Sequence, residues 1–231
     1  MEQKTLLITQ SNYIPWKGYF DMIRSADEFV LFDDMQFTKR DWRNRNTIKT
    51  SAGKHWLTIP VNVKGKFFQK INQTEIADPA WAQNHWATIC HAYRSAKCFD
   101  MYEPVIRDLY LETKTSSLSE VNRRFLEVIG AQLGIRTPMI SSTEFELHPE
   151  RTMRLIEICR ARNATHYITG PSARAYLDEQ AFADAGITIK YFDFSGYPEY
   201  PQLFGEFVHD VSVLDLLFNV GPDAPTYLER V

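Results

Sequence analysis

Residues 5–34, TLLITQSNYIPWKGYFDMIRSADEFVLFDD, decide the fold class. Thr5 to Thr9 is a short apolar run typical of a buried strand, and Glu28 to Phe32 is a second one. The residues between them, from about Trp16 to Arg24, predict a helix. A strand, a helix and a second strand form a βαβ unit, which is characteristic of a parallel sheet, so we expect an α/β fold.

The middle of the chain predicts a hairpin and then helices. Ala52-Gly53 separates two alternating runs, 46–49 and 55–59, as in a β-hairpin, and residues 71–76 form another β-like run. From Pro79 to about Gly134, apolar residues recur at steps of three or four, and Gly134 is placed to end the last helix.

The last third alternates between strand-like and helix-like segments. We expect strands at 139–140, 166–169 and 187–192, and helices at 149–162, 180–185 and 211–218. The whole chain, residues 1–231, is therefore predicted to form one domain. It would contain a mostly parallel sheet, flanking helices, a β-hairpin excursion and an inserted helical segment. The alternative is a helical subdomain over residues 79–134 that meets the rest at a cleft.

Composition excludes several classes of protein. The formal net charge is -3, so nothing global attracts nucleic acid, and no apolar run approaches the roughly 20 residues of a transmembrane helix. The first residues show no secretory pattern, and three cysteines without C-x-x-C spacing argue for reduced thiols. We expect a cytoplasmic protein with no membrane span, no metal site and no cofactor.

Polar residues follow the two strands of the first βαβ unit. Gln10 and Asn12 come after the first strand, and Asp33 and Asp34 come after the second. Ligands of parallel sheets bind at the carboxyl ends of strands, so these side chains are the first candidates for a site. An acidic pair can raise the pKa of one member, and we therefore assign Asp34 as a candidate general base. Capping of the strand or an ion pair is the alternative.

Residues 39–46, KRDWRNRN, are the most polar and cationic stretch of the chain. Arginine forks and asparagine amides suit phosphate, carboxylate and sugar hydroxyl groups, and Trp42 could stack on a base or a sugar ring. The net charge favours a small anion such as a sugar nucleotide over a long polyanion. A solvated basic loop is the alternative.

His85 falls on the predicted helix face that also carries Trp81 and Tyr93. A histidine in a pocket is a candidate base, whereas a lone histidine on an apolar face is commonly a hydrogen-bonded core residue. Both interpretations stay open. The chain contains no G-x-S-x-G, H-E-x-x-H, Walker or G-x-G-x-x-G motif.

Two blocks of this sequence resemble the WbqC-like family. Residues 10–20, QSNYIPWKGYF, are similar to the opening motif Q-P-N-Y-x-P-W-x-G-Y, with Ser11 in place of the proline, and residues 34–46, DMQFTKRDWRNRN, are similar to the second signature. Trp56 to Val61, Tyr200 with Gln202, and residues 212–221 also fit, so the resemblance spans nearly the whole chain.

The resemblance implies a transferase of O-antigen or related surface-polysaccharide biosynthesis. It would move an aminoacyl group, such as glycyl, or a related acyl group onto the amine of a nucleotide-linked amino sugar. The partners would be this sugar and an activated donor, with an acyl carrier protein as one candidate carrier. Asp34 and His85 are the candidate bases. The candidate substrate-binding residues are Gln10, Asn12, Tyr13, Trp16, Gln36, Lys39, Trp42, Asn44, Arg45, Asn46 and Tyr93.

Two rival functions stay open. A strand followed by a loop that opens a helix resembles the HUP-like layout of nucleotidylyltransferases and class I synthetases. The two histidines of their H-x-G-H element are absent, because Trp16 and Tyr19 flank Lys17-Gly18 instead. The second rival is a non-catalytic protein that binds a sugar nucleotide or a carrier protein.

Overall fold

The structure is a computed structural model that describes residues 3–229. The strands are β1 Thr5–Thr9, β2 Glu28–Leu31, β3 Arg45–Thr50, β4 Gly53–Thr58, β5 Met139–Ser141, β6 His166–Thr169 and β7 Thr188–Tyr191. The α-helices are α1 Lys17–Arg24, α2 Trp81–Tyr93, α3 Phe99–Leu111, α4 Leu118–Gln132, α5 Arg151–Ala161, α6 Glu179–Asp184 and α7 Val213–Val220. Short 3-10 helices are η1 Ile71–Gln73, η2 Ser142–Glu144, η3 Pro171–Ala175 and η4 Gly221–Leu228.

Five strands form one parallel sheet in the order β5-β2-β1-β6-β7. The central strand β1 pairs with β2 on one side and with β6 on the other, and Leu7 lies opposite both Phe29 and Ile168. β3 and β4 form a separate antiparallel hairpin. The predicted α/β class, the parallel sheet and the hairpin excursion are therefore confirmed.

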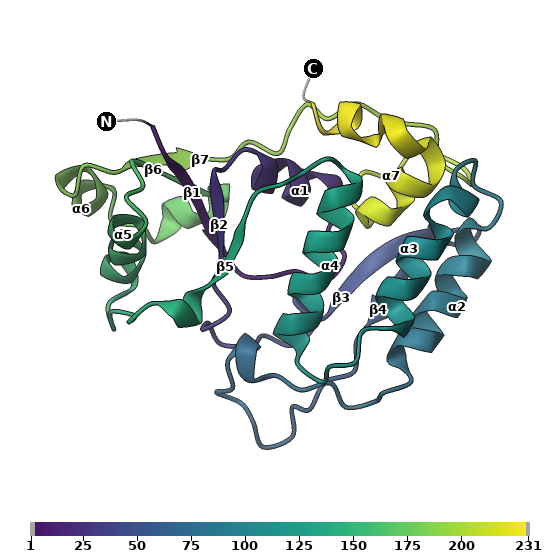
Figure 1. Cartoon of the computed structure of the whole chain (residues 1–231), viewed down its shortest axis with the longest axis horizontal. Coiled ribbons are helices and arrows are strands. Elements are labelled where there is room, and N and C mark those ends of the chain that lie inside the picture. Colours follow the sequence, from purple (N-terminus) through teal and green to yellow (C-terminus); the bar gives the residue numbers. More distant parts are fainter. Residues whose placement is uncertain (1–2, 230–231) are drawn as a thin grey trace.

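Alternate residues of β1 supply both faces of the sheet. Leu6 and Ile8 belong to an apolar cluster with residues of α5 and α6, whereas Leu7 belongs to a second cluster with residues of α1 and α4. Figure 1 shows α5 and α6 on one side of the sheet and α1 and α4 on the other. Because both faces are covered, the strand is apolar at every inner position.

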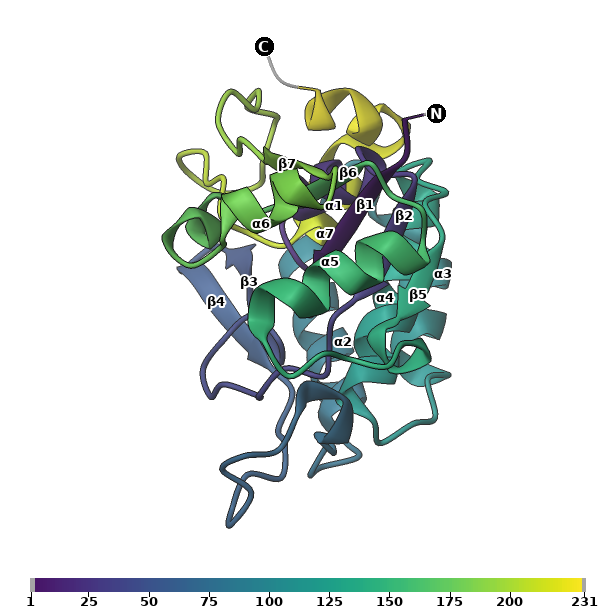
Figure 2. The same ribbon diagram turned by 90° about the vertical axis from the view of Figure 1, so that its left-hand side faces the viewer.

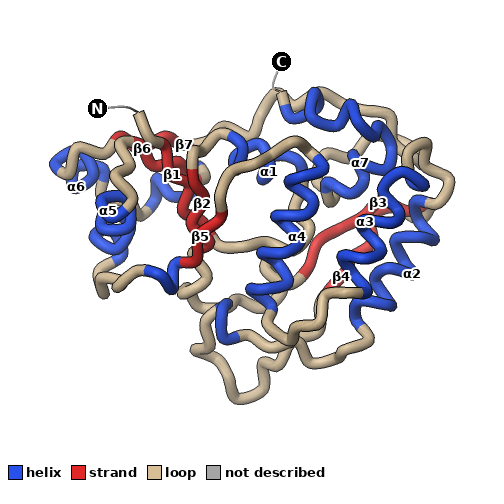
Figure 3. The backbone as a smooth tube through the Cα atoms, in the orientation of Figure 1, coloured by secondary structure: helices blue, strands red, loops and turns tan. Residues whose placement is uncertain are grey.

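The helical insertion lies between β2 and β5 in the chain, together with the hairpin. Figure 3 shows α2, α3 and α4 as neighbouring helices beside the hairpin, with α7 above them. Residues of these helices share one continuous apolar cluster with Leu7, Phe29 and Leu31 of the sheet. The inserted helical segment is as predicted, and the division of the chain into domains stays a prediction.

The predicted strand at 71–76 is wrong over its first half, because Ile71–Gln73 forms the 3-10 helix η1. Local polar contacts decide this. Thr74 Oγ1 donates to the carbonyl of Lys70 at 2.8 Å, and the Lys70 amide donates to Gln73 Oε1 at 3.1 Å. Side-chain bonds of this kind compete with strand pairing, and isolated bridges involve only Glu75 and Ile76 from this run.

The strand order reverses at β1. The chain passes from β1 to β2 and β5 on one side and later returns to place β6 and β7 on the other side. A crevice therefore opens between the loops that follow β1 and β6, and in sheets of this type ligands bind at that switch point. No helix within residues 3–229 has the length and apolar character needed to cross a membrane.

Candidate functional site

A buried polar network holds the loop that follows β1. Ser11 donates its amide and its hydroxyl to the Asp33 carboxylate, at 2.8 and 2.7 Å, and Ser119 also donates to it. Asn122 Nδ2 donates to Ser11 Oγ at 3.0 Å and to the Arg43 carbonyl at 2.8 Å. Burial raises the pKa of Asp33 despite these bonds. The network ties the loop after β1 to the loop after β2, to helix α4 and to the basic segment.

The loop then makes a strained turn into α1. Ile14 has φ 35°, a left-handed backbone conformation that β-branched residues rarely adopt. Two bonds to the preceding residue hold the turn, since the Tyr13 amide donates to the Trp42 carbonyl at 3.0 Å and Asn46 Nδ2 donates to the Tyr13 carbonyl at 3.1 Å. Backbone strain of this kind persists only where surrounding bonds impose it, and it concentrates at functional sites.

Arg43 extends its guanidinium group to both polar residues of the loop. It donates to Gln10 Oε1 at 2.9 Å and to Asn12 Oδ1. Its Nε lies 3.8 Å from Asp41 Oδ2, and its side chain is 17% exposed. The arginine therefore fixes the orientation of two amide side chains and still faces solvent with part of its charge.

The first cavity lies beside Asn12 and has a volume of about 230 Å³. It is lined by Asn12, Pro15, Trp16, Trp42, Asn46 and Asp210. Four of these six residues, Asn12, Trp16, Trp42 and Asn46, are among the substrate-binding residues predicted from the sequence. Rings with a few polar groups suit a sugar or a base, so we call this space the tryptophan cavity.

The aromatic wall of the tryptophan cavity continues onto the hairpin. The rings of Trp42 and Trp56 lie 5.6 Å apart, and the two side chains are 44% and 43% exposed. The Arg45 guanidinium carbon lies 4.1 Å from the centre of the Trp56 ring. This cation–π contact aligns an arginine and two tryptophans on one accessible surface.

The second cavity, of about 270 Å³, lies at the switch point of the sheet. It is lined by Ile8, Thr9, Gln10, Phe32, Met35, Arg151, Leu155, Tyr167, Thr169 and Tyr176. Thr9 and Thr169 end the neighbouring strands β1 and β6, and Arg151 begins α5 with its guanidinium carbon 4.7 Å from the centre of the Tyr176 ring. We call this space the switch-point cavity; it combines hydroxyl groups, an amide and a cation.

Arg43 is hydrogen-bonded to one lining residue of each cavity, although it is not itself among the lining residues. Its partner Gln10 lines the switch-point cavity, and its partner Asn12 lines the tryptophan cavity. The guanidinium group therefore couples the orientation of one amide side chain in each cavity. Arginine forks also bind phosphate oxygens, so the guanidinium group is a candidate contact for an anionic ligand.

Asp34 lies in a different environment, at the end of β2 that faces η1 and η2. Its carboxylate accepts bonds from Ser142 Oγ at 2.6 Å, and from Lys70 Nζ and Asn72 Nδ2 at 3.2 Å each. Burial raises the pKa of Asp34, but these hydrogen bonds outweigh it, so the pKa lies below its ordinary value. The ion pair that the sequence offered as an alternative is present, with Lys70 as the partner.

Gln36 and Lys39 belong to the same sequence block as Asp34. Gln36 Nε2 donates to the carbonyl of Phe67 at 2.8 Å, and the side chain of Lys39 is exposed. Neither residue lines the two cavities, as far as the described part of the chain shows. The structure thus divides the second sequence block, because its first half contacts the loop at 61–70 and its second half forms the tryptophan cavity.

His85 is buried and uses both ring nitrogens. Nε2 lies 3.2 Å from the Thr58 carbonyl, which can only accept, so Nδ1 accepts the bond from the Tyr13 hydroxyl at 2.9 Å. Tyr13 OH also lies 2.6 Å from Tyr110 OH. Burial lowers the pKa of His85 to about 4, and the ring is neutral at pH 7.

Tyr93 and Asn44, two further residues predicted for the site, are buried and are not among the lining residues of either cavity. Tyr93 donates to Asp215 Oδ2 at 2.9 Å, and Asn44 donates to the Ile59 carbonyl at 2.8 Å. Asn44 Oδ1 and Arg45 Nε have no hydrogen-bond partner among residues 3–229. Neither Asp34 nor His85 lines either cavity, within the same residues, and their catalytic roles stay predictions.

Sequence reasoning missed four residues of this region: Arg43, Arg151, Tyr176 and Asp210. Arg43 carried a signal, because it lies inside the basic segment and is flanked by predicted site residues. The other three are far away in the chain and no local pattern marks them. Asp210 is exposed and pairs with Lys54 at 2.6 Å.

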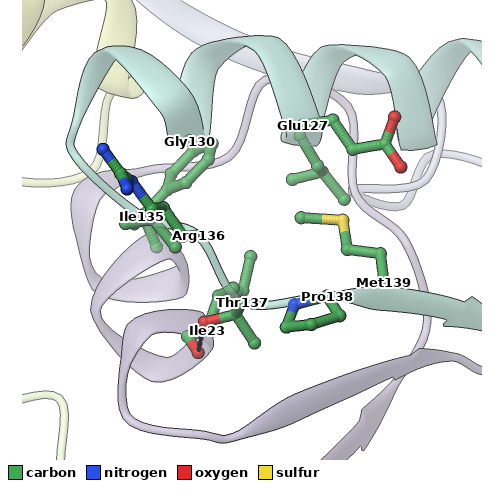
Figure 4. A pocket seen from close by; sticks show the side chains of 10 residues that line it. Ile23, Glu127, Gly130, Ile135, Arg136, Thr137, Pro138 and Met139 are labelled. Atoms are coloured by element: carbon green, nitrogen blue, oxygen red, sulfur yellow. Dashed lines mark hydrogen bonds between the residues drawn. The ribbon is translucent and has the colours of Figure 1, made fainter.

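A further cavity, of about 230 Å³, lies between α4 and the segment before β5. Figure 4 shows apolar side chains facing it, with the charged ends of Glu127 and Arg136 pointing away. The Thr137 hydroxyl is bonded to the Ile23 carbonyl at 3.0 Å. Since few polar groups converge there, we do not assign it as the substrate site.

The sequence model of the WbqC-like protein family matches residues 10–227. The chain belongs to the WbqC-like family. This WbqC-like protein is also 50% identical over 225 residues to "Uncharacterized protein Rv1507c" of Mycobacterium tuberculosis (strain ATCC 25618 / H37Rv), with 97% of each chain covered. No solved structure matches it. The match begins at Gln10, so it includes the loop, the basic segment and the whole lining of the tryptophan cavity, and it includes the switch-point cavity except for Ile8 and Thr9.

Proposed function

We propose that this WbqC-like protein is a transferase of surface-polysaccharide biosynthesis that acylates the amine of a nucleotide-linked amino sugar. The acyl group is aminoacyl, with glycyl as the first candidate, or a related group. The supporting observation is that Arg43 is hydrogen-bonded to one lining residue of each of two cavities, one of which lies at the switch point of a parallel sheet. A sugar nucleotide has two parts of different chemistry joined by a diphosphate, and the site has the same division.

The switch-point cavity suits the nucleotide part of the substrate. Arg151 supplies a cation at its edge, and Thr9 and Thr169 supply hydroxyl groups at the ends of adjacent strands. The Tyr176 ring offers a surface on which a base could stack. In this arrangement the diphosphate lies at Arg43, whose guanidinium group has donors beyond the two that hold Gln10 and Asn12.

The tryptophan cavity suits the amino sugar. Trp16 and Trp42 offer ring faces to the apolar side of a pyranose, while Asn12 and Asn46 offer amide groups to its hydroxyls. Asp210 is the carboxylate of this cavity and would attract the ammonium group of the sugar. The accessible surface of Trp42, Arg45 and Trp56 lies beside it and would receive the acyl donor.

The reaction needs a base and donors for a developing oxyanion. The ammonium group loses a proton to the base, and the amine nitrogen forms a bond to the donor's carbonyl carbon. The bond from that carbon to the leaving group then breaks, and the leaving group takes up a proton. Amide donors such as Asn12 Nδ2 are suited to the carbonyl oxygen. Asp210, Asp34 and His85 are the candidates for the base.

The test is mass spectrometry of a nucleotide-linked 4-amino sugar incubated with the full chain. Carrier-bound glycine, other aminoacyl thioesters and glycyl-tRNA are offered in parallel as donors. We expect a mass gain of one aminoacyl group that depends on the protein. If no donor gives a product although the sugar nucleotide binds, acyl transfer is excluded and a non-catalytic binding protein becomes the better interpretation.

Three variants separate the candidate bases. Asp210→Asn, Asp34→Asn and His85→Gln each remove one titratable group with little change in volume. Loss of kcat with unchanged affinity for the sugar nucleotide identifies the base. A variant with full activity removes its residue from consideration.

One observation bears on the rival that transfers nucleotidyl groups. The strand order at the switch point favours nucleotide binding. The two positions where that rival needs histidines carry Trp16, which lines the tryptophan cavity, and Tyr19, whose hydroxyl donates to the Gln10 carbonyl at 2.7 Å. Release of pyrophosphate from ATP would revive this rival, and its absence favours acyl transfer.

A further inference from the structure

The loop at residues 61–70 exposes two adjacent phenylalanines. The side chain of Phe67 is 73% exposed and that of Phe68 is 83% exposed, and their rings pack edge to face with centres 5.0 Å apart. Scattered exposed apolar side chains are ordinary on protein surfaces, but two neighbouring rings form a patch that favours an apolar partner.

The base of this loop is fixed by hydrogen bonds. Gln69 Nε2 donates to the Asn62 carbonyl at 2.9 Å, and the Phe37 amide donates to the Gln69 carbonyl at 2.9 Å. Gln36 Nε2 holds the carbonyl of Phe67 itself at 2.8 Å. The backbone that carries the two rings is therefore ordered before any partner binds, so little conformational entropy is lost on binding.

Several cations belong to the same loop and to the segment at its base. Lys64, Lys66 and Lys70 lie within the loop. Residues 36–37 pair with the base of the loop, and Lys39 and Arg40 follow them in the chain. Lys66 pairs with Glu75 and Lys70 pairs with Asp34, each at 3.2 Å, and exposed pairs of this kind are weak. Lys39, Arg40 and Lys64 form no ion pair with any residue of 3–229. The loop at 61–70 and residues 36–40 thus carry five basic side chains and no acidic one, on a chain whose formal net charge is -3.

The loop also projects from the molecule. Figure 2 shows it as the dark blue segment that extends furthest at the bottom, beyond the end at which β1 and β2 finish. Its continuation is tied to that end, because the Asn72 amide donates to the Asp33 carbonyl at 3.0 Å. A protein partner would need a pocket that matches a protruding pair of rings, whereas a bilayer accepts such a tip at any position on its surface.

We propose that the loop at 61–70 docks the protein on a bilayer rich in anionic phospholipid. Phe67 and Phe68 enter the boundary between headgroups and acyl chains, and the lysines around them meet lipid phosphates. Docking in this way turns the end of the sheet that carries the switch-point cavity towards the membrane. The inference does not depend on the proposed acyl transfer.

The test is cosedimentation of the full chain with vesicles and no substrate. One vesicle preparation contains phosphatidylglycerol mixed with phosphatidylcholine, and a second contains phosphatidylcholine alone. We expect binding to the anionic vesicles that weakens at high salt, and a loss of about tenfold or more in affinity for both Phe67→Ser/Phe68→Ser and Lys64→Glu/Lys66→Glu. Met101→Ser, at a side chain that is 60% exposed on α3, and Lys97→Glu/Lys114→Glu are matched controls that keep binding.

Three results would overturn the proposal. The first is wild-type protein that stays in the supernatant with anionic vesicles. The second is a Phe67→Ser/Phe68→Ser variant with an unchanged melting temperature that sediments as the wild type does. The third is a wild-type protein that forms dimers in sedimentation velocity which the same variant abolishes, because the rings would then contact a second copy of the chain.

Discussion

The indole ring of Trp16 lies over the Cα of Gly18, so close that a Cβ at residue 18 would come within 2.4 Å of it. The same ring meets Tyr197 edge-on at 5.5 Å and Phe194 at 5.7 Å, and it lines the tryptophan cavity. The glycine of the opening motif is therefore required by a side chain two residues earlier, and that side chain is a wall of the candidate site.

Gly18→Ala is expected to displace Trp16. Because the ring is enclosed by Tyr197 and Phe194, it has to leave its present position, at a cost of about 1–3 kcal/mol in the free energy of unfolding. Chemical denaturation measures this cost. Gly130→Ala is the matched control, since Gly130 also lies in a helix and its added Cβ would make ordinary contacts at 3.8 Å. That change should stabilise the protein by up to about 1 kcal/mol. Equal effects of the two changes would contradict the conclusion that Trp16 requires a glycine at position 18.

Arg43→Met is expected to weaken binding of a nucleotide-linked amino sugar by about ten- to a hundredfold. The change removes the guanidinium group that orients Gln10 and Asn12. It also removes the positive charge next to these two lining residues. Arg43→Lys should restore little of the lost affinity, because an ammonium group lacks the planar fork of donors that binds both amides. Isothermal titration calorimetry measures the affinity. Arg124→Met, at an exposed position of α4, is the control, and an equal loss there would argue against a role for Arg43.

His85 is expected to make the folded protein less stable as the pH falls. Its pKa is about 4 in the folded state, owing to burial, against 6.5 for a free side chain. The unfolded chain therefore takes up a proton between pH 6.5 and 4 while the folded chain does not, and stability present above pH 6.5 is lost across this window. The loss is about 2–3 kcal/mol.

Urea denaturation at a series of pH values tests the role of His85. His85→Gln should abolish most of the slope between pH 6.5 and 4, because the amide does not titrate there. His91→Gln changes an exposed histidine of the same helix and should leave the slope intact. A wild-type slope in His85→Gln would show that other groups cause the acid instability.

Glu28 is expected to stabilise the fold above pH 4.5. Arg162 binds both of its carboxylate oxygens, at 2.8 and 2.9 Å, and Lys4 adds a third bond at 2.9 Å. The hydrogen bond from Arg162 and the contacts of Lys4 lower the pKa of Glu28 from 4.5 to about 2. The stabilisation is therefore complete above pH 4.5 and is lost as the pH falls towards 2.

Glu28→Gln should cost about 1 kcal/mol at pH 7, a value that allows for solvent screening of this group. The same variant should show a flatter dependence of stability on pH below 4.5. Glu103→Gln, which removes an exposed pair with Arg107 on α3, is the control and should change the free energy of unfolding by a few tenths of a kcal/mol. A loss in Glu28→Gln no larger than in this control would mean that the three bonds of Glu28 contribute nothing.

Much of the fold was predictable because its signals are local. β1 and β2 are uninterrupted apolar runs, and the hairpin turns at the predicted place, with Gly53 at φ 100°. Gly134, at φ 73°, follows the end of α4 as expected. The strand predicted at 71–76 was wrong over its first half, because short-range side-chain bonds outweighed the β-like composition of these residues.

The candidate site was only half predictable. Asn12, Trp16, Trp42 and Asn46 were found because two sequence blocks gather them, and the structure brings them to one cavity. Asp210 joins that cavity from the far end of the chain. Arg151 and Tyr176 reach the switch point only because β6 pairs beside β1. Sequence separation hides such neighbours, since no local period relates them.

The sequence alone determined the α/β class, the first βαβ unit, the hairpin and the residue types of the site, because periodicity, turn chemistry and polarity act over a few residues. The tertiary structure decided the strand order, the pairing of Arg43 with Gln10 and Asn12, and the separation of Asp34 from both cavities. These three features depend on contacts between segments far apart in the chain. The strand order that covers both faces of the sheet is favoured by the energy of packing, and it brings these segments together.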